Sequence, residues 1–131
     1  MNSVPQLRDA LKDCWENDLL DEALKLIHPN EWQRLLADWS CWGRDTQLAP
    51  GTLDDDVPSG PGGYATWLIL GGRGAGKTRA GAEWVRGLAL GLRPIATVPV
   101  SPIALVAETF QDGREVMVEG VSGLLAVHGA A

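Results

Sequence analysis

A glycine-rich octapeptide near the middle of the chain constrains its fold and its chemistry more than any other stretch. Residues 71–78 read Gly-Gly-Arg-Gly-Ala-Gly-Lys-Thr and fit the pattern G-x-x-x-x-G-K-[ST], which is typical of phosphate-binding loops. An apolar run, residues 66–70, precedes the loop, and apolar residues at helical spacing follow it without a proline until Pro94. The sequence therefore predicts a strand, a loop and a helix in the order that such a loop requires.

The residue types in this loop suit the binding of a triphosphate. A backbone that approaches an anion closely is predicted at the small residues Gly71, Gly72, Gly74, Ala75 and Gly76. The N-terminus of the following helix adds unpaired N–H groups and the positive end of the helix dipole. Lys77 supplies a charge for the β- and γ-phosphates, and the hydroxyl of Thr78 can ligate Mg²⁺. The alternative is a glycine-rich turn that binds nothing, and the flanking strand and helix argue against it.

Composition limits the class of protein. The 131 residues are enough for one domain, and 45% hydrophobic with 21% charged residues is ordinary for a globular chain. The net charge of −6 divides into −7 for residues 1–60 (5 basic, 12 acidic) and +1 for residues 61–131 (6 basic, 5 acidic), so composition gives no nucleic-acid signal. The sequence shows neither a signal peptide nor an apolar run long enough for a membrane helix, so we expect a cytoplasmic protein.

Residues 1–49 are predicted to form a helical N-terminal region. Ser3 and Gln6 have the spacing of a capping box for a first helix, and apolar residues recur at helical spacing after them. A second amphipathic helix is predicted to end at Pro29, and Asn30 is predicted to cap a third.

Two further regions complete the predicted organisation. Residues 50–63 are rich in Pro, Gly and Asp and are predicted to form a loop. Residues 64–131 hold the phosphate-binding loop, a second apolar strand over residues 103–107, and a helix capped by Thr109. The predicted fold class is α/β: an incomplete P-loop NTPase with a parallel sheet, preceded by the helical region.

Three stretches resemble the large terminase subunits of phages and gene-transfer agents, the motors that drive DNA into preformed capsids. Residues 70–85, Leu-Gly-Gly-Arg-Gly-Ala-Gly-Lys-Thr-Arg-Ala-Gly-Ala-Glu-Trp-Val, resemble their ATPase motif. Residues 42–50, Trp-Gly-Arg-Asp-Thr-Gln-Leu-Ala-Pro, resemble their upstream adenine-recognition segment. Residues 104–109, 114–120 and 122–125 resemble the segment after the second strand, so the resemblance covers roughly residues 30 to 128.

The resemblance implies a ligand and roles for individual residues. It implies that Lys77 and Thr78 bind ATP and Mg²⁺ and that Gln47 contacts the adenine edge. It also implies that Arg73 is a catalytic residue near the γ-phosphate, where its charge would offset that of the transition state. The partners of the full-length family are DNA, the portal and the small terminase subunit, and the family implies no membrane contact.

The chain also departs from the family pattern. An apolar strand ending in Asp-Glu, a coupling motif and a nuclease domain are expected after the second strand, and none of them follows Val106. We therefore expect an N-terminal part of a packaging ATPase that hydrolyses ATP negligibly, because a carboxylate that helps to hold Mg²⁺ is missing.

Two other functions compete with this interpretation. One is a noncatalytic interaction module whose acidic helical half docks to a packaging or capsid partner. The other is a small-molecule kinase, which is disfavoured because the chain supplies neither a lid nor a substrate-binding segment.

Overall fold

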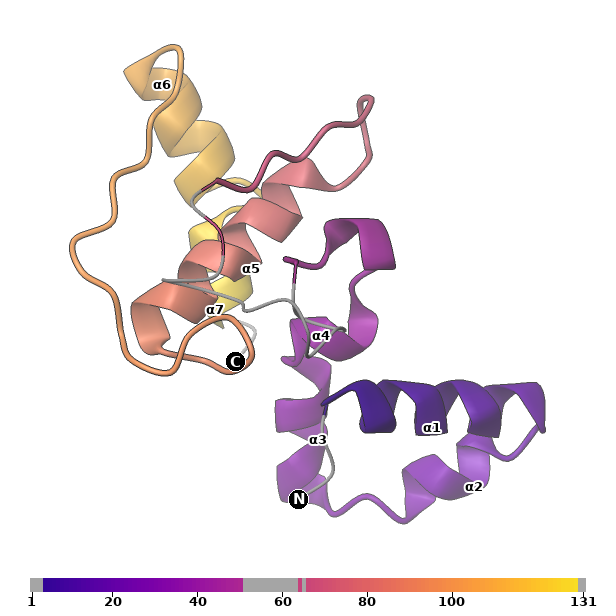
Figure 1. Ribbon diagram of the computed structural model, residues 1–131. Coiled ribbons are helices and arrows are strands. Elements are labelled where there is room, and N and C mark those ends of the chain that lie inside the picture. The colour runs from indigo at the N-terminus through magenta and orange to yellow at the C-terminus, as the bar shows by residue number, and fades with distance from the viewer. Residues whose placement is uncertain (1–3, 51–63, 65, 130–131) are drawn as a thin grey trace.

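The computed structural model describes residues 4–50, 64 and 66–129. Its elements in chain order are α1 (Val4–Glu16), α2 (Leu20–Lys25), α3 (Pro29–Leu36), α4 (Trp39–Trp42), the 3₁₀ turn η1 (Asp45–Gln47), α5 (Lys77–Leu90), α6 (Phe110–Asp112), the π-helical turn η2 (Gly113–Val118) and α7 (Leu124–Gly129) (Figure 1). None of the described helices combines the length and the apolar character that crossing a bilayer requires.

Helices α1 to α4 and the turn η1 make up an N-terminal cluster. Helix α1 packs against α2 and α4, and α3 packs against α4. The boundary between the second and third helices differs from the prediction, because Pro29 begins α3 instead of ending α2. His28, not Asn30, is the N-cap, and its Nδ1 accepts a hydrogen bond from the backbone N–H of Asn30 at 3.3 Å. Proline suits the first helical position because that residue needs no N–H partner. The predicted cap at Ser3 and nearly all of the predicted loop 50–63 lie outside the described residues.

One arginine ties α1 to the turn that leads toward the glycine-rich loop. Nη1 of Arg8 donates to the carbonyl oxygens of Ser40 at 3.1 Å and Gly43 at 2.7 Å. Nη2 of Arg8 donates to Oδ1 of Asp45 at 2.6 Å. These contacts fix the start of η1 against α1, and they thereby set the position of Gln47 at the end of η1.

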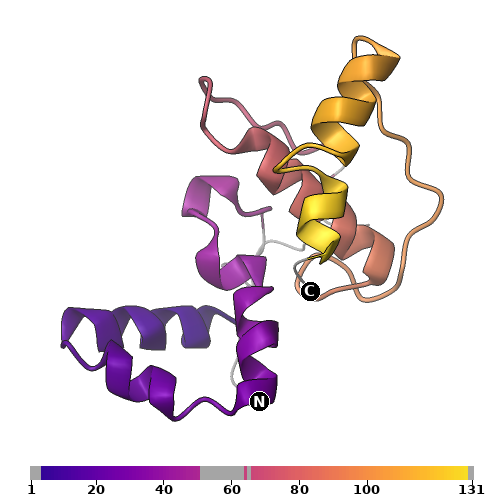
Figure 2. The same cartoon turned by 180° about the vertical axis from the view of Figure 1, so that it is seen from behind.

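Helices α5 and α7 and the turn η2 make up a C-terminal cluster. Helix α5 packs against α7 and η2, and Val127 of α7 is only 2% exposed (Figure 2). After α5 the chain folds back over the helix, because Gly87 leaves room for Ile95, whose Cβ would lie 2.9 Å from a Cβ at position 87. The predicted cap at Thr109 is confirmed: its Oγ1 accepts a hydrogen bond from the N–H of Asp112 at 3.0 Å.

The predicted parallel sheet is wrong: the described residues form no β-strand. The two apolar runs that were predicted as strands, residues 66–70 and 103–107, are irregular and make no backbone hydrogen bond to another described residue. The two segments also run apart from each other in both views (Figures 1 and 2). The described part of the chain is therefore helical, and the α/β P-loop class is not what the structure shows.

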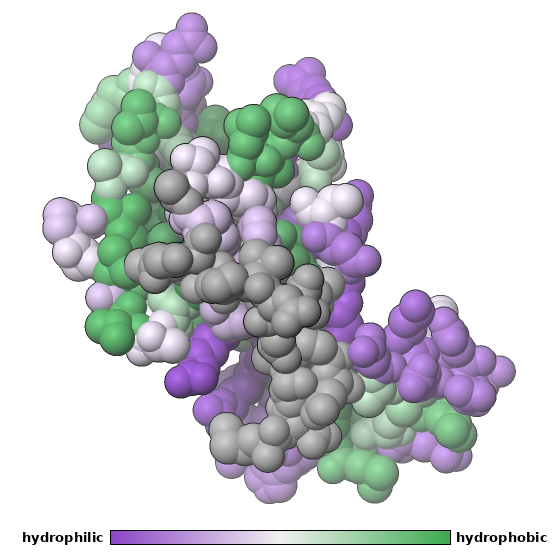
Figure 3. Space-filling view, in the orientation of Figure 1, coloured by the Kyte–Doolittle hydropathy of each residue, from purple (hydrophilic) through white to green (hydrophobic). Residues whose placement is uncertain are grey.

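The physical reason lies in what a strand needs from its neighbours. A strand gains its stability from ladder hydrogen bonds and from side chains packed on both faces of a parallel sheet. In the irregular segments these faces are open: the exposed fractions are 73% for Leu68, 82% for Leu70 and 83% for Val106. Figure 3 shows apolar side chains gathered over the coil that leads to α6 and over the segment that leads to the glycine-rich loop. An apolar run alone therefore did not suffice to form a strand.

Candidate phosphate-binding site

The glycine-rich loop enters α5 through two residues with positive φ. Gly74 has φ of +79° and Gly76 has φ of +82°, a region that residues with a Cβ rarely adopt. Between them, the N–H of Ala75 donates to the carbonyl of Gly72 at 3.3 Å and closes a turn. Gly76 is the N-cap of α5 and supplies no side-chain cap. The first N–H groups of the helix therefore face the loop without a side-chain acceptor, which is the arrangement that favours an anion.

Lys77 is the first residue of α5, and its side chain folds back over the loop. Its Nζ donates to the carbonyl oxygens of Gly71 at 2.8 Å and Gly72 at 2.7 Å. The ammonium group thus lies against the backbone at the start of the loop. A phosphate bound at this loop would meet the positive charge of Lys77 and the positive end of the helix dipole, and both favour an anion.

Thr78 and Arg73 take different positions. Thr78 is half-buried in the first turn of α5, and Arg73 is exposed at the tip of the loop. Mg²⁺ in nucleotide sites keeps several waters and uses one or two protein ligands beside the phosphate oxygens, so the Thr78 hydroxyl fits that role. The described residues hold no group of three or more His, Cys, Asp or Glu side chains that would form a separate metal site.

The structure brings Gln47 to the loop across 28 sequence positions. Its Nε2 donates to the carbonyl of Ala75 at 2.9 Å, and its Oε1 accepts from the N–H of Arg44 at 3.1 Å. Gln47 is only 8% exposed, and Gly76 leaves room for it, since a Cβ at position 76 would lie 2.1 Å from Nε2. Gln47 therefore supports the loop directly, and the predicted contact with adenine stays a prediction.

A cavity of about 450 Å³ lies between the N-terminal cluster and α5. Its walls include Gln47, Trp39, Trp67, Trp84, Glu83 and Arg86. The rings of Trp67 and Trp84 meet edge to face, with centroids 6.0 Å apart. In the described part of the chain, three buried polar atoms at this cavity have no hydrogen-bond partner: Glu83 Oε2, Trp84 Nε1 and Arg86 Nε.

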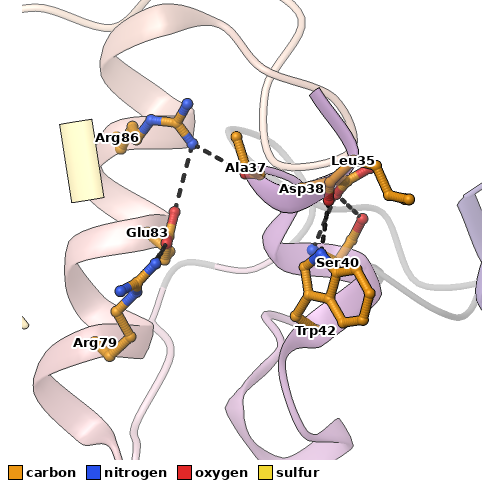
Figure 4. Close-up of polar contacts among 8 residues, drawn as sticks. All are labelled: Leu35, Ala37, Asp38, Ser40, Trp42, Arg79, Glu83 and Arg86. Atoms are coloured by element: carbon orange, nitrogen blue, oxygen red, sulfur yellow. Dashed lines mark hydrogen bonds and ion pairs between the residues drawn. The ribbon is translucent and has the colours of Figure 1, made fainter. Parts of the chain in front are cut away.

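Glu83 is a residue that the sequence pattern did not single out. Arg79, Glu83 and Arg86 have i, i+4 and i, i+3 spacing, which predicts ion pairs along one helix face. That spacing carries no information about burial, yet the side chain of Glu83 is only 3% exposed. Figure 4 shows it between the side chains of Arg79 and Arg86. Glu83 shares the helical spacing of Ala80, Trp84, Gly87 and Leu88, which places it on the packed face of α5, but the sequence alone indicated no role for a carboxylate there.

The two cysteines differ in environment, which yields a testable difference in reactivity. Cys41 is buried in α4, and burial together with the carboxylate of Asp38 raises the pKa of its thiol from 9.0 to about 11. The thiolate is the reactive form, so a rise of this size lowers the reactive fraction about 100-fold. Cys14 is half-buried on α1.

We therefore expect Cys14 to react at least about tenfold faster than Cys41 with a chromogenic disulfide reagent at mildly alkaline pH. The variants Cys41→Ser and Cys14→Ser, each with a single thiol, separate the two rates. Equal rates in the two folded variants would contradict the buried position of Cys41.

Comparison of the chain with protein-family models, with curated proteins and with solved structures finds no match.

Proposed function

We propose that the chain binds ATP–Mg²⁺ through the glycine-rich loop and the N-terminus of α5. The observation that carries the proposal is the position of Lys77, whose Nζ lies 2.8 and 2.7 Å from the carbonyl oxygens of Gly71 and Gly72 at the start of a 14-residue helix. A lysine charge, open helix N–H groups and glycines with positive φ converge there, and each of them favours a phosphate group.

Each loop residue has a role in this proposal. The backbone N–H groups of the loop and of the first turn of α5 hold the phosphate oxygens, and Lys77 neutralises part of their charge. The Thr78 hydroxyl is the protein ligand for Mg²⁺, which supplies charge neutralisation on the phosphates when it is bound. Arg73, exposed at the loop tip, is the candidate for a contact with the γ-phosphate.

The biological role that we propose is that of a terminase-type packaging ATPase. The support is the order of the three stretches that resemble this family, together with the contact between Gln47 and Ala75, which joins two of them. DNA, the portal and the small terminase subunit are the partners that this role implies, and the cytoplasm is the compartment. The sequence contains no apolar strand ending in Asp-Glu, so we propose that this chain binds ATP without hydrolysing it appreciably.

Isothermal titration calorimetry of the purified 131-residue chain with ATP–Mg²⁺ tests the proposal. We expect saturable binding, and we expect phosphate release no faster than that of the Lys77→Ala variant. A folded chain, verified by its helical circular dichroism, that shows no heat of ATP binding would refute the nucleotide site. Turnover well above the Lys77→Ala level would refute the claim that hydrolysis is negligible.

A second candidate is a noncatalytic interaction module that docks to packaging or capsid proteins. Large exposed apolar side chains favour it: Phe110 is 86% exposed and Val121 is 96% exposed, in addition to the open faces of residues 66–70. The same titration separates the two candidates, because a docking module has no reason to bind ATP–Mg²⁺ through Lys77.

A further inference from the structure

The two helical clusters are joined by polar contacts that converge on one buried carboxylate. Nη1 of Arg86 on α5 donates to the carbonyl of Ala37 in the N-terminal cluster, at 3.5 Å (Figure 4). The guanidinium of Arg79, also on α5, lies 5.4 Å from the ring centroid of Trp39 in α4, within the range of a cation–π contact. Both arginines therefore reach from α5 to the neighbouring cluster.

Glu83 forms ion pairs with both of these arginines and accepts a hydrogen bond from Arg79. Nη2 and Nε of Arg79 lie 2.6 and 2.9 Å from Oε1 of Glu83, and Nη1 of Arg86 lies 3.5 Å from Oε2. An exposed i, i+4 pair on a helix contributes little and needs no burial. A carboxylate that is only 3% exposed is different, because burial of a charge is unfavourable unless its partners stay in place. The position of Glu83 thus requires that Arg79 and Arg86 remain where they are.

The remainder of this interface, as far as the described residues form it, is not tightly packed. The cavity of about 450 Å³ lies between the clusters and is bordered by Trp39, Glu83 and Arg86. Among the described residues, apolar packing across it is incomplete, so the two arginine contacts carry a larger share of the docking than they would in a filled core. Disrupting them should move the N-terminal cluster relative to α5.

Such a movement would reach the phosphate-binding loop through a short connection. Gly43 follows α4 and lies against Trp39, since a Cβ there would be 2.9 Å from the indole. The next residue, Arg44, donates its N–H to Gln47, whose Nε2 in turn donates to Ala75 of the loop. Trp39, which Arg79 contacts, is therefore linked to the loop by residues in direct contact.

We propose that Glu83 is a positioning residue for the phosphate-binding loop. By holding Arg79 against Trp39 and Arg86 against the Ala37 carbonyl, it keeps the N-terminal cluster on α5 and the Gln47 amide on the Ala75 carbonyl. Its importance for nucleotide binding rests on the proposed function of the loop. The contact of Gln47 with the loop does not depend on the proposed function, because it is measured without nucleotide.

The first test is the side-chain amide of Gln47, observed by NMR in the nucleotide-free protein. In Glu83→Gln, which keeps the shape of the side chain and removes its charge, we expect the Gln47 NH₂ signals to move to the shifts of an exposed glutamine and to exchange faster with solvent. Glu16→Gln is the matched control, because Glu16 is an exposed carboxylate at the end of α1. Unchanged Gln47 signals in folded Glu83→Gln would overturn the proposal.

The second test is a double-mutant cycle on ATP–Mg²⁺ affinity. We expect Glu83→Gln and Gln47→Ala each to weaken binding roughly fivefold, and the double variant to be no weaker than Gln47→Ala alone, because residues that act through one another are not additive. Losses that multiply in the double variant would show that Glu83 does not act through Gln47, and they would overturn the proposal.

A variant that does not fold can be replaced by a milder one. If Glu83→Gln does not fold, Arg86→Met removes the contact with Ala37 while Arg79 still pairs with Glu83. We then expect a smaller shift of the Gln47 signals in the same direction, and no shift would overturn the proposal.

If the wild-type chain binds no ATP–Mg²⁺, the proposed function fails, and the Gln47 signals alone decide whether Glu83 positions the loop.

Discussion

Replacing Lys77 with alanine is expected to weaken the binding of ATP–Mg²⁺ by about 10- to 100-fold. Lys77 donates to the carbonyls of Gly71 and Gly72, and a bound phosphate would replace these neutral acceptors with a charged one. A charge-assisted hydrogen bond contributes about 1.5–3 kcal/mol, which corresponds to this range of affinity. Isothermal titration calorimetry at constant ionic strength measures the change.

Lys25→Ala is the control for a general effect of charge. Lys25 lies exposed in the last turn of α2, in the N-terminal cluster, and its removal changes the net charge by the same amount. We expect its affinity for ATP–Mg²⁺ to equal that of the wild type. Equal losses of ATP–Mg²⁺ affinity in the two variants would mean that binding depends on the net charge of the protein and not on a site at the loop.

Replacing Gly76 with alanine is expected to lower the free energy of unfolding by about 1–3 kcal/mol and to displace Gln47 from the loop. The φ of +82° at this position is strained for any residue with a Cβ. The new methyl group would also lie 2.1 Å from Nε2 of Gln47, so the amide has to leave the carbonyl of Ala75. Denaturant unfolding followed by circular dichroism measures the loss of stability.

Gly81→Ala gives the matched control within the same helix. A Cβ at Gly81 meets nothing within 4 Å, and the residue lies inside α5 without a positive φ. Because alanine loses less backbone entropy than glycine in a helix, this variant is expected to raise the free energy of unfolding by about 0.5–1 kcal/mol. Opposite signs for the two substitutions are the expected result. A neutral Gly76→Ala would show that the loop adopts another conformation at this residue.

Local patterns predicted the helical elements well. Apolar spacing indicated a helix directly after the glycine-rich loop, and α5 begins at Lys77, next to the glycines that the pattern requires. Thr109 was recognised as an N-cap from its residue type and position. Such features depend on residues within a few positions of one another, so the sequence displays them directly. The error at Pro29 arose because proline is favourable at the start of a helix as well as unfavourable inside one.

The predicted strands are absent from the described residues for a reason that is not local in sequence. Residues 66–70 and 103–107 have the apolar composition of buried strands, yet strand formation depends on partners elsewhere in the chain. The large exposed fractions of Leu68, Leu70 and Val106 show that the described residues do not provide such partners. Composition of a short run indicates how well it would pack in a sheet and not whether a sheet is present.

The sequence by itself determined the octapeptide of residues 71–78, its position at the start of a helix and the small residues that the loop needs. These properties follow from local sterics and helix periodicity. Only the tertiary structure decided that Gln47 lies against Gly76, that Glu83 is paired with two arginines, and that the apolar runs have no strand neighbours among the described residues. Those outcomes depend on burial and on contacts between residues far apart in sequence, which are settled when the helical clusters pack together and not by any single segment.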